Sequence, residues 1–202
     1  MKKILIGITG GIGSGKSTVT EYYKELGYYI LKADDIAKQV MVEDEAIIAN
    51  IKKEFGGDCY IDGRLNTKYL AEKAFSHPDR VAKLNKIVHP KAIAKVKKEA
   101  GQLLNEKNIV IVEAAILFEA HWEDIFDYII LITSDENNRI KRVIERDNVS
   151  IKEIKSRMMH QLPDNDKKGK ADFVIENNSS IEALKERAKF IITLIENISK
   201  NS

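Results

Sequence analysis

The feature that most constrains this chain is a glycine-rich turn close to its start. The apolar run 4–8 leads into residues 10–17, which read GGIGSGKS and fit the pattern G-x-x-x-x-G-K-[ST]. This pattern predicts a buried strand, a tight turn and a helix that begins at about Lys16. Glycines let the backbone wrap an anion with successive N–H groups pointing inward, and the helix start adds unsatisfied donors. We therefore predict a site for the phosphates of a nucleoside triphosphate.

Each position of this turn has a physical task in holding ATP. Lys16 would bridge the β and γ phosphates, and the Ser17 hydroxyl would ligate Mg²⁺. A turn without a ligand is the alternative, although average residue usage gives the full pattern by chance in only about one in a hundred chains of this length. A dinucleotide site is excluded, because G-x-G-x-x-G begun at Gly13 would need a glycine where Thr18 stands. The predicted ATP-binding residues of the turn are Gly11, Ile12, Gly13, Ser14, Gly15, Lys16, Ser17 and Thr18.

Composition limits what else the chain can be. Of its 202 residues 44% are hydrophobic, and 33 basic residues stand against 31 acidic ones. This balance is typical of a soluble globular protein of about one domain and gives no overall signal for nucleic acid. No apolar run approaches the roughly 20 residues of a membrane span, and the single cysteine, Cys59, allows no intramolecular disulfide. We therefore expect a cytoplasmic protein without membrane or nucleic-acid partners, and a monomer, with an oligomer left open.

Strand and helix patterns alternate along the chain. The strand patterns lie at 4–8, 28–31, 109–112, 128–132 and 173–175. The third and fourth are β-branched without strict alternation, as expected of strands covered on both faces of a parallel sheet. Helical patterns lie at 16–26, 46–55, 68–75, 78–88, 90–104, 137–146, 151–159 and 181–198. We predict an α/β fold of the P-loop NTPase type, with three layers around a parallel five-stranded sheet.

The region between the second and third strands is unusually long. Residues 34–108 show several helical patterns and no convincing strand. We interpret them as an inserted helical substrate domain, because insertions of this kind commonly determine which acceptor is bound. The predicted parts are a core at about 1–33, 109–144 and 172–202, the insertion at about 34–108, and a helical lid at about 145–171. The basic stretch 167–170 is interpreted as a solvated loop.

The turn at 10–17 is shared by kinases, GTPases, motor ATPases and nucleotide-sensing regulators. A GTPase should carry Asn-Lys-x-Asp, but the nearest match, at 85–88, reads Asn-Lys-Ile-Val and lacks the acidic residue. A motor ATPase should have an apolar strand that ends in a carboxylate, and the strand ending at Glu113 offers one. An ATP-dependent switch or binding module therefore stays open beside a kinase.

Two carboxylates directly follow the second predicted strand. In a parallel sheet Asp34 and Asp35 would lie at the carboxyl edge, beside the phosphate-binding turn. A carboxylate there can orient an acceptor hydroxyl and receive its proton, which is a role found in kinases. Alternatively, either residue caps a helix that starts near Ile36. We assign Asp34 as the catalytic base and Asp35 as the cap.

Arginines cluster in the helical pattern at 137–146. Arg139, Arg142 and Arg146 are spaced three and four apart, so that they share one helix face. Guanidinium groups match phosphate oxygens and can stabilise charge on a transferring phosphoryl group. Solvent exposure is the alternative and the usual state of an arginine on a helix. Spacing alone does not decide between the two.

Separated motifs along the chain resemble those of the dephospho-CoA kinase family. Residues 9–17, TGGIGSGKS, are similar to the opening motif of that family. Further similarities are 33–37 to D-A-D-x-I-A, 84–90 to L-x-x-I-x-H-P, 116–119 to P-L-L-F-E, 146–147 to R-D, 157–161 to R-x-x-x-Q and 171–177 to A-D-Y-V-I-D-N. The resemblance covers nearly the whole chain, and several motifs in the right order are far more specific than one.

The resemblance implies an ATP-dependent kinase that phosphorylates the ribose 3′-hydroxyl of dephospho-CoA, the last step of coenzyme A synthesis. It implies that Asp34 is the general base. Arg142, to which we also assign a catalytic role, and Arg146 fall where lid-proximal arginines contact phosphates, and Asn177 lies near the expected adenine pocket. The substrate-binding residues that the resemblance implies are Thr9, Asp34, His89, Leu117, Phe118 and Glu119.

The chain also departs from the family pattern. Lys32 replaces the first Asp of D-A-D, Ala115 replaces the proline before L-L-F-E, and Thr67 stands where arginine is frequent. Glu113 stands where Asp is usual, and its longer arm could still hold a Mg²⁺-bound water, so that we predict a metal site at Ser17 and Glu113. These departures bear on substrate binding more than on the reaction type. A P-loop kinase for another small hydroxylated acceptor, of the nucleoside monophosphate or shikimate type, is the alternative.

Overall fold

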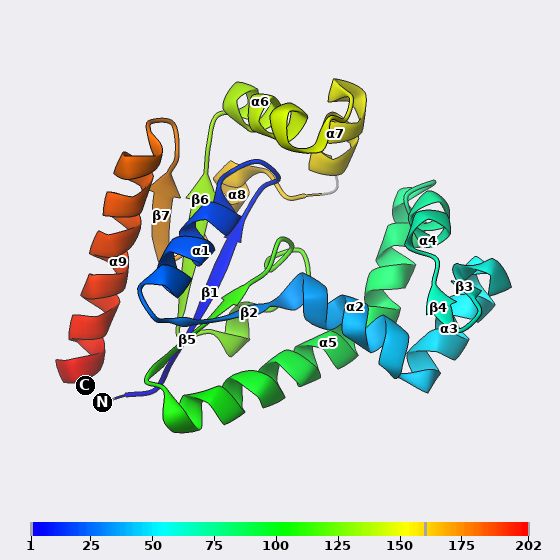
Figure 1. The fold of residues 1–202 in the computed structure, drawn as a ribbon, viewed down its shortest axis with the longest axis horizontal. Helices are drawn as coiled ribbons and strands as arrows, with labels where there is room; N and C mark the ends of the chain where they lie inside the picture. The colour runs from blue at the N-terminus through cyan, green and yellow to red at the C-terminus, as the bar shows by residue number, and fades with distance from the viewer. Residues whose placement is uncertain (1, 160, 202) are drawn as a thin grey trace. The chain divides into compact units, whose positions relative to one another are not determined.

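Figure 1 shows the computed structural model of the chain, which describes residues 2–159 and 161–201. Outside the described residues lie Met1, His160 and Ser202, the second of them within the predicted lid. The chain divides into two compact units. The inserted unit is Ala33–Lys97, and the core unit joins the residues up to Lys32 to those from Lys98 onward. The chain therefore leaves the core unit once and returns to it once.

The core unit is built around a parallel sheet. Among the described residues, five strands form this sheet in the order β2-β5-β1-β6-β7, and every neighbouring pair is parallel. The strands are β1 (Ile4–Gly10), β2 (Tyr29–Lys32), β5 (Ile109–Glu113), β6 (Tyr128–Thr133) and β7 (Phe173–Glu176). The central strands are almost wholly buried, which explains why their sequences are apolar runs without alternation. The predicted α/β fold with a five-stranded parallel sheet is confirmed.

The strand register decides what meets at the carboxyl edge of the sheet. Ile8 on β1 and Lys32 on β2 both pair with Glu113, the last residue of β5. The glycine-rich turn follows β1 directly and emerges at the same edge. Backbone pairing alone therefore holds Glu113 close to the turn.

Helices of the core unit cover the sheet and complete its hydrophobic core. They are α1 (Lys16–Glu25), α6 (Glu136–Asp147), α7 (Ile151–Met158), α8 (Asp164–Lys168) and α9 (Ile181–Asn201), with a 3₁₀ turn at Glu123–Ile125. In the cluster between the sheet, α1 and α9, Leu184 and Ile192 of α9 are buried with Ile6 of β1. Full burial of a side chain of this size contributes about 1.5–3 kcal/mol. Tyr23 of α1 also donates to the Ala188 carbonyl at 2.8 Å, which joins the two helices.

The inserted unit is mainly helical but contains a hairpin that we did not predict. Its elements are α2 (Ala33–Glu43), α3 (Glu45–Phe55), a 3₁₀ turn at Gly57–Cys59, β3 (Tyr60–Ile61), β4 (Arg64–Leu65), α4 (Thr67–Ala74) and the greater part of α5 (Pro78–Glu106). The two strands pair antiparallel around Asp62 and Gly63, whose φ angles are 48° and 74°. Asp-Gly is a strong hairpin signal, but strands this short carry no periodic pattern. The prediction of no strand within 34–108 is wrong here.

A single helix, α5, replaces two predicted ones. It runs through Pro90, where we expected a new helix to begin because proline lacks an N–H and clashes with the preceding turn. Val88, Ala92 and Val96 are buried at intervals of four residues. One apolar stripe thus continues on both sides of the proline, and its burial outweighs the lost hydrogen bond.

Candidate active site

The glycine-rich turn between β1 and α1 adopts a conformation that its glycines permit. Gly13 and Gly15 have φ angles of 76° and 100°, in the left-handed region that other residues disfavour. A Cβ on Gly13 would lie 2.5 Å from the backbone oxygen of Arg139, and one on Gly15 would collide with the amide of Asn177. Both backbone conformation and close packing therefore require glycine.

Three side chains, from α6 and from the loop after β7, hold the carbonyl groups of this turn. They donate as follows: Arg139 Nε to Ile12 O at 2.9 Å, Arg142 Nη1 to Gly13 O at 3.3 Å, and Asn177 Nδ2 to Ser14 O at 2.8 Å. In a trans peptide the C=O and the following N–H point in opposite directions. Because the Ile12 carbonyl points toward Arg139, the Gly13 N–H points away from Arg139. In the same way, the Ser14 carbonyl points toward Asn177 and the Gly15 N–H points away from it. The N–H groups of Gly13 and Gly15 are thus oriented as in the backbone nests that bind anions.

Lys16, the first residue of α1, forms an ion pair with Glu113. Its Nζ lies 2.6 Å from Glu113 Oε1, and both side chains are largely buried. Ser17 Oγ donates to the same oxygen at 3.0 Å, and Thr20 Oγ1 donates to Oε2 at 2.8 Å. Burial raises the pKa of Glu113, but the Lys16 charge and the three hydrogen bonds outweigh it and hold that pKa below its usual range. Glu113 is therefore a carboxylate at neutral pH.

The two arginines predicted to contact phosphates lie in different surroundings. Besides Gly13 O, Arg142 donates to Ser134 Oγ at 3.1 Å and to the Asn177 carbonyl at 2.9 Å. Arg146 lies in the last turn of α6, where its exposed guanidinium pairs with Asp147 at 2.7 Å. The structure thus brings Arg142 and Asn177 to the turn, whereas Arg146 lies farther along the helix.

Arg139 is a residue of the site that we did not assign from the sequence. The available signal was its position three residues before Arg142, on the same helix face. Solvent exposure is the commoner state of such an arginine, but this side chain is only 12% exposed. Its guanidinium packs against Gly11, where a Cβ would collide with it, and pairs with Asp164 at 3.3 Å.

The segment after β5 contributes packing and an anchor. Leu117 and Phe118 are fully buried, and Leu117 fills the space beside Gly7 of β1. Glu119 Oε1 accepts from the Leu162 N–H at 2.8 Å. The structure therefore places two of the predicted substrate contacts in the hydrophobic core, and ties Glu119 to a distant segment of the chain.

Lys167 corrects our interpretation of 167–170 as a solvated loop. The residue lies in α8 and is fully buried, with its Nζ 2.8 Å from Glu119 Oε1. The two groups form an ion pair without well-directed hydrogen-bond geometry. Burying an ammonium group costs several kcal/mol unless it is paired. In a run of lysines, no local pattern indicates which one will be buried.

Thr9, another predicted substrate contact, lies inside the carboxyl end of β1. It is fully buried, as is Ser14 in the turn, and within the described residues the hydroxyl groups of both have no hydrogen-bond partner. An unpaired buried hydroxyl costs about 1–3 kcal/mol. The site therefore carries two polar groups whose bonding capacity is unused by the protein.

The remaining predicted residues, Asp34 and His89, belong to the inserted unit. Helix α2 begins at Ala33, so that Asp34 and Asp35 lie in its first turn, where acidic residues stabilise the helix dipole. The prediction that Asp35 caps the helix is wrong, and its exposed carboxylate pairs with Lys38 at 3.4 Å. His89 lies within α5, where burial lowers its pKa and favours the neutral imidazole.

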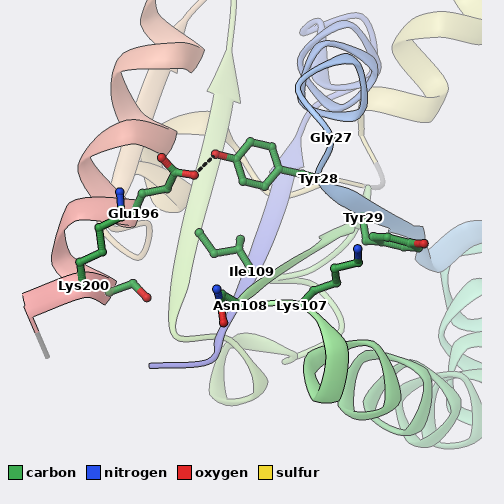
Figure 2. Close-up of a pocket in the computed structure, with 9 residues that line it drawn as sticks. Gly27, Tyr28, Tyr29, Lys107, Asn108, Ile109, Glu196 and Lys200 are labelled. Atoms are coloured by element: carbon green, nitrogen blue, oxygen red, sulfur yellow. Dashed lines mark hydrogen bonds between the residues drawn. The ribbon is translucent and has the colours of Figure 1, made fainter. Parts of the chain in front are cut away.

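A separate cavity of about 200 Å³ lies at the amino edge of the core unit's sheet. It is lined by Gly27, Tyr28, Tyr29, Lys107, Asn108, Ile109, Glu196, Ser199 and Lys200. Figure 2 shows the Tyr28 hydroxyl donating to Glu196 of α9, at 2.6 Å. Ile109 begins β5 and Glu113 ends it, which separates the cavity from the phosphate-binding turn by about 13 Å of strand. The cavity is therefore not part of that site.

Sequence comparisons match almost the whole chain to one family. A family model described as dephospho-CoA kinase matches residues 4–183. A dephospho-CoA kinase from Dehalococcoides mccartyi is 40% identical, over 90% of this chain and 92% of its own. Another, from Chlorobium luteolum, is 35% identical over 91% of this chain and 87% of its own. The matched range contains the turn, the inserted unit and α6 to α8.

Two solved structures that are similar to this chain match it over almost its whole length. TT1252 from Thermus thermophilus is 33% identical with a TM-score of 0.81, and the match covers 96% of this chain and 98% of that one. The dephospho-CoA kinase from Campylobacter jejuni is 28% identical with a TM-score of 0.71 over 98% of each chain. A shikimate kinase from Acinetobacter baumannii, at 16% identity and a TM-score of 0.56 over 96% and 94% of the two chains, shares the fold alone.

Proposed function

This chain belongs to the dephospho-CoA kinase family, and from this premise we propose how its own residues carry out the reaction. The enzyme transfers the γ-phosphate of ATP to the ribose 3′-hydroxyl of dephospho-CoA and releases coenzyme A and ADP, the final step of coenzyme A biosynthesis. The observation that carries the account is the turn whose carbonyls are held by Arg139, Arg142 and Asn177. It is a pre-formed phosphate site in a chain that matches a kinase family along its length.

Lys16 changes partner in the proposed reaction. Its ammonium pairs with Glu113 in the structure, and it moves to the β and γ phosphates when ATP binds. The N–H groups of Gly13 and Gly15 and the start of α1 add further donors. The charge that develops on the transferring phosphoryl group then meets donors already in place, which lowers the barrier without reorganisation.

Ser17 and Glu113 fit the binding of Mg²⁺. Their oxygens lie 3.0 Å apart, and hydroxyl and carboxylate oxygens are the hard ligands that Mg²⁺ takes. Within the described residues no three or more His, Cys, Asp or Glu side chains form a metal cluster, so that ATP oxygens and water would supply the other ligands. When bound, Mg²⁺ would neutralise charge on the phosphates. Once Lys16 has moved to the phosphates, Glu113 Oε1 would be available to bind Mg²⁺.

We assign Asp34 as the general base and the inserted unit as the part that binds dephospho-CoA. The position of Asp34 in the chain supports its role as general base. Asp34 comes two residues after Lys32, and Lys32 pairs in register with Glu113. A carboxylate there can accept the proton of the 3′-hydroxyl as its oxygen attacks the γ-phosphorus. His89 belongs to the same unit, and its lowered pKa favours a neutral imidazole that can exchange a hydrogen bond with substrate.

We assign Arg142 an indirect role in ATP binding, because its Nη1 group donates to Gly13 O and Ser134 Oγ and its Nη2 group donates to the Asn177 carbonyl. It would act by holding the turn rather than by touching phosphate. Arg146 keeps its predicted role as a phosphate contact from the lid side. Its bond to Asp147 is exposed, and an exposed pair of this kind is worth little and is readily exchanged for a phosphate.

We propose a cytoplasmic location for the enzyme. Cys59 is a free, buried thiol, which suits a reducing compartment. In the part of the chain that the structure describes, no helix combines the length and apolar character needed to cross a membrane.

An acceptor panel tests the proposed function. ADP release is measured with dephospho-CoA, with a nucleoside monophosphate, with shikimate and with no acceptor, each at saturating ATP and Mg²⁺. We expect turnover with dephospho-CoA to exceed turnover with every other condition by at least about a hundredfold. Equal ADP release without an acceptor would favour an ATP-dependent switch, and faster turnover with another acceptor would refute the assigned substrate.

A further inference from the structure

Gln161 joins two parts of the active site through one side chain. Its Oε1 accepts from the Ile12 N–H at 2.9 Å, and its Nε2 donates to the Ala115 carbonyl at 3.3 Å. Ile12 lies in the phosphate-binding turn, and Ala115 lies two residues beyond Glu113. One amide group thus bridges the turn and the segment that follows the carboxylate.

Both backbone groups of Ile12 are held by side chains far away in the sequence. Gln161 accepts from its N–H, and Arg139 donates to its C=O at 2.9 Å. Arg139 also pairs with Asp164, three residues after Gln161. The peptide units on both sides of Ile12 are therefore fixed, and the second of them contains the Gly13 N–H that faces the anion site.

The segment that carries Gln161 is itself anchored. The Leu162 N–H donates to Glu119 Oε1 at 2.8 Å, and the buried Lys167 lies 2.8 Å from the same oxygen. Together with the Arg139–Asp164 pair, these contacts fix residues 161–168 at several points. A side chain positions a reactive site well only when its own support is rigid, and Gln161 has such support.

We propose that Gln161 is a positioning residue for phosphoryl transfer, which sets the spacing between the phosphate-binding turn and the end of β5 that carries Glu113. The inference rests on the proposed kinase reaction and adds a group that acts through Ile12 and Ala115. A neutral amide is suited to this place, because it offers one acceptor and one donor to two fixed backbone groups. If the distance between the turn and Glu113 changes, the donors of the turn are no longer aligned with the charge of the transition state, whereas ATP can still bind. The expected effect is therefore a lower kcat with a smaller change in the affinity for ATP.

Three substitutions test this inference. Gln161→Met is nearly isosteric and removes both hydrogen bonds, whereas Gln161→Glu keeps the acceptor for the Ile12 N–H and removes the donor to Ala115. Asn165→Met is the matched control, since it replaces an exposed amide of α8 in the same segment. For each protein we would measure kcat, the KM values for ATP and dephospho-CoA, the melting temperature, and amide hydrogen exchange in residues 8–18 of the free protein.

We expect Gln161→Met to lower kcat about tenfold or more, to change KM for dephospho-CoA by less than about twofold, and to speed exchange in the turn. Gln161→Glu should show the slow amide exchange of the wild-type turn but a lower kcat. Asn165→Met should match the wild type in both exchange and kcat. Wild-type kcat and exchange in Gln161→Met, or equal losses in Asn165→Met, would overturn the inference.

The exchange measurement also separates this inference from the proposed function. A wild-type enzyme that does not phosphorylate dephospho-CoA would refute the function. Exchange in the free Gln161→Met protein would still show whether Gln161 holds the turn, because no substrate enters that comparison. If Gln161→Met is unfolded at the assay temperature, Gln161→Glu provides the test, because it keeps the acceptor for the Ile12 N–H. Faster amide exchange in the turn of Gln161→Glu would then count against the proposed role of the bond to Ile12.

Discussion

Lys16 and Ser17 bind Glu113 in the structure through the same groups that they would offer to the phosphates and to Mg²⁺. Glu113 accepts bonds from Lys16, Ser17 and Thr20, and this set fixes its ionised form. In the proposed mechanism, nucleotide binding would be an exchange of partners in which the Lys16 ammonium passes from a carboxylate to phosphate oxygens. With Mg²⁺ beside Glu113 in place of Lys16, such an exchange would keep both charged groups paired and avoid the cost of an unpaired buried charge.

Neighbouring carboxylates provide a test of the general base. Asp34→Asn should lower kcat by about a hundredfold or more, because it removes the proton acceptor while keeping the size of the side chain. Asp35→Asn is the control, since Asp35 lies in the same first turn of α2 and its exposed carboxylate pairs with Lys38. Steady-state kinetics on both variants would measure the effect. Full activity in Asp34→Asn, or equal losses in the two variants, would refute the assignment.

The lowered pKa of Glu113 predicts how stability depends on pH. Its folded-state pKa lies below its unfolded value, so that its contribution is present above the unfolded pKa and is lost as pH falls through the folded pKa. The difference in free energy of unfolding between wild type and Glu113→Gln should therefore be larger at about pH 7 than at about pH 4. Urea unfolding at the two pH values measures it. A difference that does not change with pH would show that the charge of Glu113 contributes nothing.

At the residue scale, site residues could be predicted from the sequence where they lie within one contiguous motif. Lys16 and Ser17 follow from the pattern that also forms the turn. Arg139 and Gln161 could not be found in this way, because each acts on Ile12 from more than a hundred residues away and nothing in its own neighbourhood indicates the partner. The burial of Lys167 depends in the same way on Glu119, which comes from another part of the chain.

The secondary-structure elements were predictable where burial dictates the sequence. Strands covered on both faces must be apolar, and β1, β5 and β6 were found within two residues of their observed ends for that reason. Helix α5 was not, because proline is a local signal whereas the buried stripe through Val88 and Ala92 that overrides it depends on packing. The β3–β4 hairpin was missed because two-residue strands have no period to detect.

The turn requires glycine for two reasons, its positive φ angles and its close packing, and the two can be measured separately. Gly13 and Gly27 both have positive φ, 76° and 93°, but a Cβ on Gly27 would meet no atom within 4 Å. Gly27→Ala should therefore cost only the backbone strain, about 1–2 kcal/mol. Gly13→Ala should cost more, because its Cβ would lie 2.5 Å from the Arg139 backbone oxygen, and it should also weaken ATP binding. Urea unfolding and ATP titration decide this, and equal losses of stability would contradict it.

At the scale of the whole molecule, ATP is assigned to the core unit and the inserted unit is proposed to provide the general base and part of the acceptor site. The residues expected to bind ATP, from the turn to Asn177, belong to the core unit, whose ends are joined by the bond from the Lys2 N–H to the Ser199 carbonyl at 3.2 Å. Of the expected acceptor-binding residues, Asp34 and His89 belong to the inserted unit, whereas Thr9, Leu117, Phe118 and Glu119 belong to the core unit. This division follows from the chain order, since a long helical insertion between two adjacent core strands could be recognised without any structure.

Ligand-dependent amide exchange should reveal this division. A ligand stabilises the unit that it binds in proportion to RT ln(1 + [L]/Kd), so that dephospho-CoA should slow exchange within Ala33–Lys97. An ATP analogue alone should instead slow exchange in the turn and at the start of α1. Mass-spectrometric exchange with each ligand in turn provides the measurement. Protection by dephospho-CoA that is confined to the core unit would contradict the assignment.

Transfer of a labelled phosphoryl group tests the central claim most directly. The enzyme is incubated with dephospho-CoA and with ATP that carries ¹⁸O in its γ-phosphoryl group, and the products are identified by mass spectrometry and phosphorus NMR. Our account predicts coenzyme A that carries the label at its ribose 3′-phosphate, formed at least about a hundredfold more slowly by Lys16→Ala. Label that appears only in inorganic phosphate, or transfer that does not depend on Lys16, would contradict it.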